Sequence, residues 1–422
     1  MSKSKSVCII GGGIIGLCTA WYALQKGHRV TVVERGGADR DGCSTGNAGM
    51  IVPSHFIPLA APGMVAMGLR MMRNPRSPFY IRPRMDKDLI AWGVNFARSA
   101  TKTHVDRSAP LLRDLSLASR AAYEELSTEF GDVFGLTRRG LLMLCKTDHA
   151  LHEEAATAAV ARELGIPADV LTPEDAAKLD PGVRMDIAGA VHCPLDAHLS
   201  PQRFVAALTD ALVAGGCDFR WQTEITGWRT EGIRVVAATT NHGGDDDITA
   251  DEFVIAGGSW SPKLARGLGL RLPIQAGKGY SVTLPHPVRK PELCSILVEA
   301  RVAVTPMGDT LRFGGTMEIA GLDETINTPR VEGILEAIPR YFPDFGPGDL
   351  RNLPVWHGLR PCSPDGLPYV GRFRRWKNLT AATGHAMMGV SLAPVTGKIV
   401  AALLSDETPP IAVDLLSPTR FG

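Results

Sequence analysis

Apolar positions near the start of the chain form two short runs, residues 7–10 and 29–33, separated by glycines and a helical pattern at 17–25. Short runs rich in Val and Ile predict buried strands, and the apolar spacing between them predicts a helix. The second run ends at Glu34. The first part of the chain therefore predicts a strand–helix–strand unit.

Further along, the same periodicities predict helices and strands in alternation. Two long helical patterns fill residues 86–130, a third covers 151–164 with Gly165 as its stop, and a fourth covers 201–214 with Ser200 as N-cap. Extended patterns occupy residues 140–145, 189–192, 218–221, 233–239, 253–255, 274–284, 301–305 and 311–315. Residues 241–247 have the composition of a hairpin tip.

Strand–helix units at the start, middle and end of the chain thus alternate with helical and antiparallel insertions. This order is typical of a discontinuous nucleotide-binding domain covered by a second domain. We expect an α/β fold, α+β overall, with a Rossmann-like domain built on a central parallel sheet from residues 1–85, 187–266 and 355–422. Residues 86–186 and 267–354 are expected to form a substrate domain with a mixed or antiparallel sheet and helices.

The glycines after the first strand have the spacing of a dinucleotide cradle. Gly11 permits the tight turn, Gly13 lets the backbone approach a pyrophosphate, and Gly16 lets the helix pack closely on its strand. Glu34 is placed to accept hydrogen bonds from a ribose, which argues against a 2′-phosphate. The alternative is a plain βαβ turn with an exposed Glu34.

A second strand–glycine–helix pattern lies near the C-terminus. Residues 378–383 predict a strand that runs into glycines at 384–389, and a helical pattern with Pro394 near its first turns follows. Such an entry aims free amides and the positive end of a helix at one point, which would favour the negative charge that a flavin gains on reduction. This pattern favours FAD over NAD, and the alternative is a routine αβ connection in which His385 packs. Only one complete dinucleotide fingerprint is present, so electrons would leave to oxygen, a quinone or a protein.

The overall charge excludes some classes of partner. The 422 residues include 45 Lys and Arg against 44 Asp and Glu, so no net field recruits nucleic acid. The eight cysteines are scattered without a CxxC pair, which indicates reduced thiols in a cytoplasmic protein and no structural metal site.

One segment bears on membranes. Residues 56–72 are largely apolar and are followed by Arg73 and Arg76, but no stretch reaches the length of a membrane span. The segment is expected to be either a buried or lid-forming piece beside the cofactor, or an interfacial patch that contacts the inner membrane face.

Several sequence blocks carry a resemblance to a known family. The blocks are STGNAG at 44–49, VIAGGSW at 254–260, WHGLRP at 356–361 and PDGLPYVG at 364–371, ahead of Gly384 and His385. In this order they resemble the D-amino acid oxidase superfamily of flavoenzymes over nearly the whole chain. Residues 47–49, 278–281 and 314–318 are most similar to bacterial D-amino acid dehydrogenases, including those acting on D-proline or D-hydroxyproline.

The resemblance implies an elongated FAD as cofactor, which makes the Rossmann-like domain an FAD-binding domain. It places one group of residues at the adenosine and pyrophosphate, namely Gly11, Gly13, Ile14, Ile15, Gly16, Glu34 and Arg35, with Ile225 near the adenine. It places a second group near the diphosphate and the isoalloxazine, namely Ser44, Thr45, Asn47, Ala48, Gly49 and Met50. The remaining expected contacts are Gly257, Trp260, Gly384, His385, Met387, Met388 and Gly389.

For the substrate, a guanidinium can bind an α-carboxylate bidentately, and Arg360 is the candidate because the matching Gly-Leu-Arg-Pro arginine of glycine oxidases is similar in this role. A buried structural ion pair is the alternative. Tyr280 and His55 are further catalytic candidates, and Lys278 and Arg301 are cationic alternatives expected to be surface charges. Glycine oxidases have an arginine where this chain has Met387, which argues against glycine as substrate.

The resemblance predicts oxidation of a D-amino acid, such as D-proline or D-hydroxyproline, by hydride transfer from Cα to flavin N5, with electrons passed to a quinone or another acceptor. One alternative is a glycine- or sarcosine-type amine oxidase that makes hydrogen peroxide. Another is the flavin-bearing subunit of a heteromeric amino-acid or opine dehydrogenase.

Overall fold

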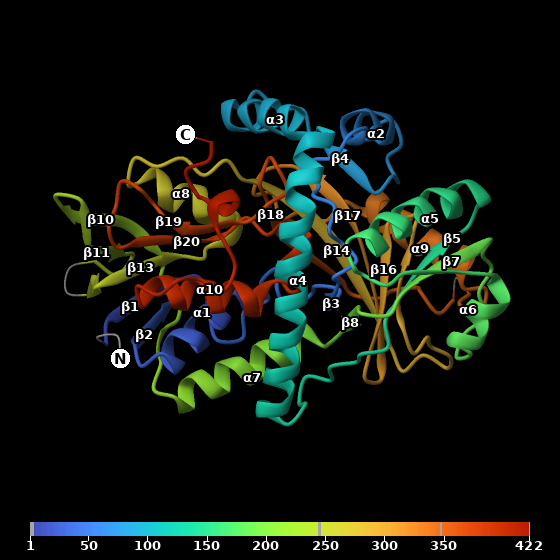
Figure 1. Ribbon diagram of the computed structural model, residues 1–422, viewed down its shortest axis with the longest axis horizontal. Helices are drawn as coiled ribbons and strands as arrows, with labels where there is room; N and C mark the ends of the chain where they lie inside the picture. Colours follow the sequence, from blue (N-terminus) through green and yellow to red (C-terminus); the bar gives the residue numbers. More distant parts are fainter. Residues whose placement is uncertain (1–3, 244–245, 347, 422) are drawn as a thin grey trace.

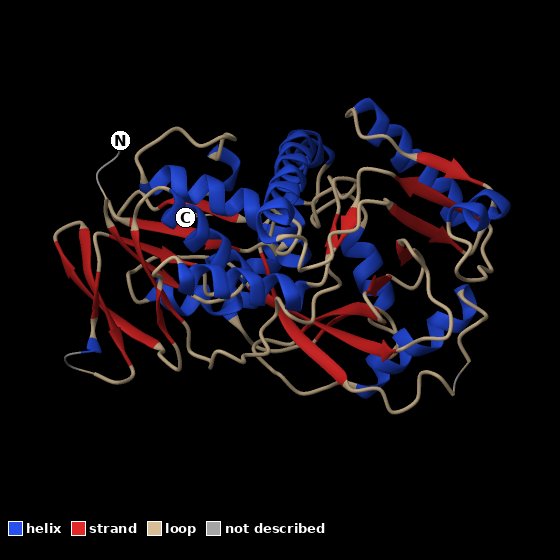
Figure 2. Cartoon of the chain, turned by 90° about the horizontal axis from the view of Figure 1, so that it is seen from below, coloured by secondary structure: helices blue, strands red, loops and turns tan. Residues whose placement is uncertain are grey.

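The computed structural model describes residues 4–243, 246–346 and 348–421. Two sheets lie side by side, and the long helix α4 (Lys102–Phe130) crosses between them (Figure 1). Seen from below, strands lie at both ends of the molecule and a group of helices lies between them (Figure 2). Parallel and antiparallel sheets occur together, which confirms the expected α/β class.

The first sheet joins strands from the start, middle and end of the chain. Its spatial order is β19 (Tyr369–Arg372), β20 (Leu379–Thr383), β13 (Glu252–Ile255), β1 (Ser6–Ile10), β2 (Arg29–Val33) and β9 (Asp218–Arg220). All neighbours are parallel except the β19–β20 pair. The central parallel sheet that the sequence predicted is therefore confirmed.

Helices α1 (Ile14–Gln25) and α10 (Ala393–Leu404) pack on this sheet, and α7 (Pro201–Ala214) packs against α1. A Cβ on Gly397 of α10 would lie 2.6 Å from the carbonyl oxygen of Cys18, so α1 and α10 pack at close range. Helix α4 joins the same core, and its Tyr123 hydroxyl donates to the carbonyl of Val390 at 2.5 Å. A small antiparallel sheet of β10 (Ile225–Glu231), β11 (Arg234–Thr240) and β12 (Ile248–Thr249), with α8 (Ser261–Arg266), flanks this end.

The second sheet is mixed and lies at the other end of the molecule. Its order is β18 (Val355–Cys362), β14 (Gln275–Pro285), β17 (Thr310–Ile319), β16 (Val302–Met307), β15 (Cys294–Leu297), β5 (Leu141–Cys145), β7 (Gly189–Cys193) and β6 (Asp169–Leu171), with β4 (Phe79–Ile81) paired to β17. Its apolar face packs against α9 (Thr328–Tyr341). The remaining elements are α2 (Met64–Met71), α3 (Lys87–Ser99), α5 (Asp148–Glu163), α6 (Pro173–Leu179), the pair β3 (Met50–Ile51) and β8 (Ala197–His198), and 3₁₀ turns η2 (Gly258–Trp260), η3 (Ala386–Met388) and η4 (Asp414–Leu416).

Several details differ from the sequence-based expectations. Strands β7 and β18 are hydrogen-bonded into the second sheet, although the segments that contain them were assigned to the FAD-binding domain. The exact domain bounds therefore stay a prediction. Helix α9 was not anticipated, because Pro329 and Pro339 interrupt its apolar pattern. Residues 244 and 245 of the expected hairpin tip lie outside the described residues.

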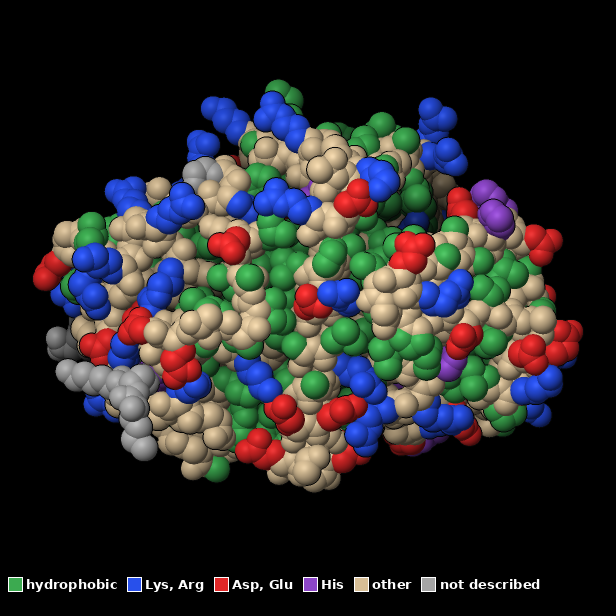
Figure 3. Space-filling view, in the orientation of Figure 1, with side chains coloured by type: hydrophobic (Ala, Val, Ile, Leu, Met, Phe, Trp, Pro, Cys, Tyr) green, Lys and Arg blue, Asp and Glu red, His purple; other side chains and the backbone are tan. Residues whose placement is uncertain are grey.

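The surface carries charges of both signs. Figure 3 shows acidic and basic side chains interspersed on one face, in keeping with the balanced composition. Among the described residues, no helix is both long and apolar enough to cross a bilayer. Every cysteine is a free thiol, and all except Cys43 are buried, as the sequence predicted.

Candidate functional site

A cleft begins where β1 ends. Gly11 has φ +116°, and a Cβ there would lie 2.5 Å from the carbonyl oxygen of Ala256. A Cβ on Gly16 would overlap the carbonyl oxygen of Gly11, so the first turn of α1 can pack against the glycine turn only if this position is glycine. A Cβ on Gly13 would make only an ordinary contact, 3.5 Å from Ser44 Oγ. The fold therefore requires Gly11 and Gly16, whereas Gly13 keeps one side of the turn open for a ligand.

Polar groups hold the turn in place. Both carboxylate oxygens of Glu34 accept backbone amides, from Gly12 and Gly36, at 2.8 Å each. A carboxylate has about four acceptor positions, so hydrogen bonds from a ribose remain possible. The Arg40 side chain donates from Nε to the carbonyl of Gly12 at 3.0 Å and lies over the Trp221 ring. Sequence reasoning missed Arg40, because no motif marks a cation in this loop.

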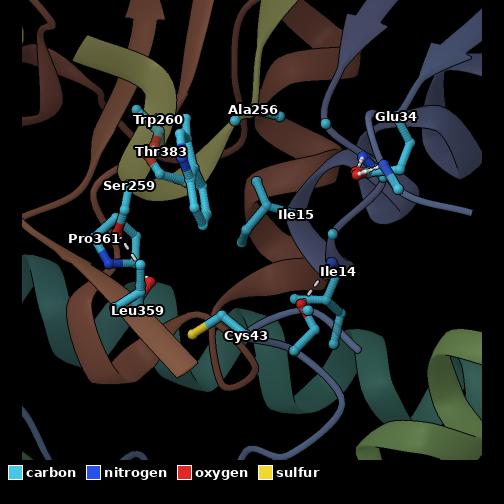
Figure 4. Close-up of a pocket in the computed structure, with 18 of the residues that line it drawn as sticks. Ile14, Ile15, Glu34, Cys43, Ala256, Ser259, Trp260, Leu359, Pro361 and Thr383 are labelled. Carbon is cyan, nitrogen blue, oxygen red and sulfur yellow. Dashed lines mark hydrogen bonds between the residues drawn. The ribbon is translucent and has the colours of Figure 1, made fainter. Parts of the chain in front are cut away.

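The cleft continues between the first sheet and the turn η2. The Arg35 guanidinium lies 3.6 Å from the Trp260 ring centroid, which brings two predicted residues together. Figure 4 shows Ile15 facing Trp260 across the cleft, with Glu34 at one end and Cys43 and Leu359 at the other. This elongated shape suits a dinucleotide bound in extended form.

The predicted cofactor residues divide into two groups. Those that line the cleft are Gly11, Gly13, Ile14, Ile15, Glu34, Arg35, Ser44, Thr45, Asn47, Ile225, Gly257, Trp260, His385 and Gly389. Those outside the lining are Gly16, Ala48, Gly49, Met50, Gly384, Met387 and Met388. Lining residues that the sequence did not single out are Gly12, Gly36, Arg40, Cys43, Thr223, Ser259, Leu359, Pro361 and Thr383. Many of these come from elements that only the tertiary fold brings to the cleft.

The C-terminal turn is partly as expected. Gly384 has φ +81°, but the 3₁₀ turn η3 follows it, and α10 starts only at Ala393. The Nε2 atom of buried His385 is 2.9 Å from Thr396 Oγ1, and burial lowers the pKa of His385 to about 3. Its buried Nδ1 has no partner among the described residues. His385, one of the residues that line the cleft, thus has a neutral ring with one buried, unsatisfied nitrogen.

The loop of residues 44–50 is held against the second sheet. Arg312 Nη1 donates to the carbonyls of Thr45 and Asn47 at 2.9 Å each, and Ser281 Oγ donates to Gly46 at 3.1 Å. Burial lowers the pKa of Arg312 to about 10. No sequence pattern marks Arg312, because its role depends on the register of β17.

Arg360 lies on the face of the second sheet that is turned toward this loop. Its register partner is Gly277, and a Cβ on the nearby Gly279 would overlap the guanidinium. Nη1 donates to the carbonyl of Thr316, and no carboxylate of a described residue lies within 4 Å of Arg360. Burial lowers the pKa of Arg360. The buried ion pair that was the alternative reading is therefore absent from the described part of the chain.

Tyr280 points the other way. It is paired with His357 in β18, packs in the core beside α9, and donates to Glu318 Oε2 at 2.7 Å. The structure thus does not bring Tyr280 to the face that carries Arg360. Lys278 is 1% exposed and donates to the carbonyl of Thr325 at 2.6 Å, so the expectation of a surface lysine is wrong. Strand alternation alone could not identify the buried face, because both faces of β14 are covered.

His55 lies outside the cleft lining but belongs to a partly buried polar chain. Ser54 Oγ lies 3.0 Å from His55 Nδ1 and donates to Asp196 Oδ2 at 2.5 Å. Burial lowers the pKa of His55 to about 4 and raises the pKa of fully buried Asp196 to about 7. Because the Ser54 hydroxyl donates its hydrogen bond to Asp196, His55 donates to Ser54 from Nδ1. This tautomer leaves His55 Nε2 as an acceptor.

Comparisons with known proteins agree with this architecture. The model of the DAO family, FAD dependent oxidoreductase, matches residues 6–403. The chain is 35% identical to a D-amino acid dehydrogenase of Methylobacterium radiotolerans, with 99% of each chain covered. It is also 35% identical to a D-amino acid dehydrogenase of Paramagnetospirillum magneticum, with 98% of each covered. Among solved structures, glycine oxidase from Geobacillus kaustophilus matches with a TM-score of 0.79 at 24% identity, covering 99% of each chain.

The residues present fit the cofactor that this family uses. The glycine turn leaves room beside Gly13, and Glu34 at the end of β2 keeps acceptor positions for a ribose. The resemblance stated from sequence is thereby confirmed. The chain belongs to the DAO family of FAD-dependent oxidoreductases, and its cofactor is FAD.

Proposed function

We propose that this enzyme oxidises a D-amino acid, with a cyclic one such as D-proline or D-hydroxyproline as the favoured class. The observation that carries the proposal is Arg360, a half-buried guanidinium with one carbonyl acceptor and no carboxylate within 4 Å among the described residues. Partly burying a cation without an anion is costly, and a substrate carboxylate would neutralise it. The names of the D-amino acid dehydrogenase relatives support the class of donor.

Arg360 has its other N–H groups available for bidentate binding of the carboxylate, and the Thr316 carbonyl fixes the plane of the guanidinium. FAD, when bound, would supply the hydride acceptor for Cα, and the imine product would be hydrolysed or, if cyclic, persist. Near Arg360 in β18 and β17, a small apolar cluster can contact the side chain of the substrate. It consists of Trp92, Met317, Ile319 and Cys362, with Ala386 packed against it. Met387 is 49% exposed and adds no charge there.

A proton must leave the substrate amine before hydride transfer. The pKa of about 4 makes neutral His55 a weak base, so in our proposal the amine proton passes to solvent and no protein base is required. Asp196 positions Ser54 through two hydrogen bonds, at 2.5 Å from the hydroxyl and 3.0 Å from the amide. These hydrogen bonds fix the orientation of His55.

Electrons then pass to a quinone in our proposal, and helices α2 and α3 supply the membrane contact. Both lie at the same edge of the molecule (Figure 1). This region exposes six large hydrophobic side chains by 42–100%: Ile57, Val65, Leu69, Met85, Ile90 and Val94. Exposed cations without a carboxylate within 4 Å among the described residues are Arg70, Arg73, Lys87 and Arg98. Apolar side chains beside free cations favour an anionic lipid surface.

The test of the membrane contact is flotation with vesicles of anionic or zwitterionic lipid. Wild-type holoenzyme should float with the anionic vesicles, and Leu69→Asp should reduce this, whereas Val213→Asp, at an exposed position of α7, should not. No flotation, or equal loss with both variants, would refute this contact.

The test of the activity is anaerobic bleaching of the flavin band near about 450 nm with D-amino acids, L-amino acids and N-methyl amines. D-proline should bleach it fastest, and a quinone analogue should restore it. Fast bleaching by glycine or N-methylglycine, with peroxide formed in air, would instead support the amine-oxidase alternative. Bleaching only after a second purified chain is added would support a subunit role.

A further inference from the structure

A second cavity, of about 480 Å³, lies on the α9 side of the second sheet. Its walls are α9, the turn 74–78 and Thr316 of β17. Arg360 lies on the opposite face of the same sheet, so this cavity is separate from the proposed substrate site.

Arg330 forms the floor of this cavity. It is 3% exposed, and Nη1 donates to the carbonyls of Asn74 and Ser77 and to Ser77 Oγ, at 2.6–3.1 Å. Its buried Nε has no partner, and no carboxylate of a described residue lies within 4 Å of the guanidinium. Arg330 also lies over the Tyr80 ring, 4.8 Å from its centroid, and its hydrogen-bond acceptors are all neutral, so no anion of a described residue neutralises this buried cation.

The carboxylates nearby are already engaged. Glu299 accepts from the Tyr341 hydroxyl at 2.5 Å, and Glu336 pairs with Arg76 at 2.7 Å. Glu318 lies beyond 4 Å and is bound by Tyr280. With exposed Arg340 at the mouth, the lining holds three arginines and two glutamates, which leaves a net charge of +1.

We propose that this cavity is a binding site for a small monocarboxylate, held by Arg330 and Arg340. One negative charge matches the net charge of the lining, whereas a dianion such as phosphate would be repelled by the two glutamates. Both the amino acid substrate and its oxo- or imino-acid product carry such a group, so either can occupy the site.

Although the two sites are separate spaces, backbone hydrogen bonds link the wall of this cavity to Arg360. The Pro78 carbonyl, next to the turn that holds Arg330, accepts from Met317 N at 2.7 Å. The neighbouring Thr316 has φ +68°, a strained value for a β-branched residue, and its carbonyl holds Arg360. A carboxylate at Arg330 therefore acts within a few residues of the substrate anchor.

The test uses oxidised holoenzyme without turnover, titrated with ¹³C-labelled acetate and followed by line broadening. We expect Arg360→Leu to retain one saturable acetate site. In that background Arg340→Gln should weaken binding about two- to fivefold, and Glu336→Gln, which frees Arg76, should tighten it by about the same factor. Arg374→Gln, at an exposed position away from the cavity, is the control and should change nothing.

Loss of all saturable binding in Arg360→Leu, or identical affinities in the Arg340 and Glu336 variants, would overturn the proposal. Tighter binding of inorganic phosphate than of acetate would overturn the assigned ligand class. The D-amino acid and its oxo acid, titrated anaerobically in the same Arg360→Leu protein after its flavin has been reduced, so that no hydride can be accepted, then show which source binds better. Because no turnover is involved, these outcomes are independent of whether the proposed oxidation is correct.

Discussion

The cofactor cleft and the substrate-facing sheet are built in different ways. The cleft depends on the backbone: positive φ at Gly11, close packing at Gly16 and amides bound by Glu34. The face around Arg360 depends on side chains whose orientation follows from strand register. A local sequence pattern can specify the first kind of site, whereas the second exists only once distant strands have paired.

The largest effect on stability should come from the glycines of the cofactor turn, because one added methyl group separates their structural role from their role in FAD binding. Gly16→Ala forces a methyl into the Gly11 carbonyl and should cost about 3 kcal/mol of unfolding free energy together with flavin binding. Gly13→Ala meets no protein atom closer than 3.5 Å and should fold normally but bind little FAD. Thermal melts of the apoproteins and flavin absorbance separate the two effects, and equal melting temperatures would contradict this account.

This contrast explains what sequence alone could deliver. The glycine turn, Glu34 and the strand–glycine pattern at Gly384 are local, so they were found. The sequence left Tyr280 open between the substrate site and the core, and Lys278 was expected on the surface, because the apolar pattern of β14 does not reveal which side faces α9. Arg312 and Arg40 were missed because each contacts backbone carbonyls that the fold alone brings near.

A second prediction concerns the pH dependence of stability. His55 has a pKa of about 4 in the folded protein against an ordinary 6.5, so the folded state binds fewer protons than the unfolded chain between these values. The resulting stability is complete above pH 6.5 and is lost as the pH falls toward 4, by about 2 kcal/mol.

Melting temperatures at pH 7 and 4.5 check this value. His55→Gln should show a smaller fall on acidification than wild type, whereas the exposed His149→Gln, as control, should match wild type. Parallel curves for wild type and His55→Gln would show that the ring is not buried in its neutral form.

A third prediction separates the two roles of Glu34, which are to hold the glycine turn and to bind FAD. Glu34→Gln removes the charge but can keep one amide acceptor, so the fold should survive while FAD affinity falls about tenfold. Fluorescence quenching of added FAD by the apoprotein measures this. An unchanged affinity would mean that the carboxylate serves only the turn.

The smallest effect should come from Tyr280. Tyr280→Phe removes a hydrogen bond to Glu318, which should lower the unfolding free energy by about 1 kcal/mol. It should change the KM for the amino acid by less than about twofold. A rise of KM by tenfold or more would place Tyr280 in the substrate site and contradict its assignment to the α9 face.

The anchoring role of Arg360 is the central claim, and it is tested most directly by how fast the bound flavin is reduced anaerobically by D-proline and by pyrrolidine, which lacks the carboxylate. Wild type should prefer D-proline by orders of magnitude, and Arg360→Leu should retain its flavin, raise the KM for D-proline by orders of magnitude and lose that preference. If the variant still distinguishes the two compounds as strongly as wild type does, Arg360 does not bind the carboxylate.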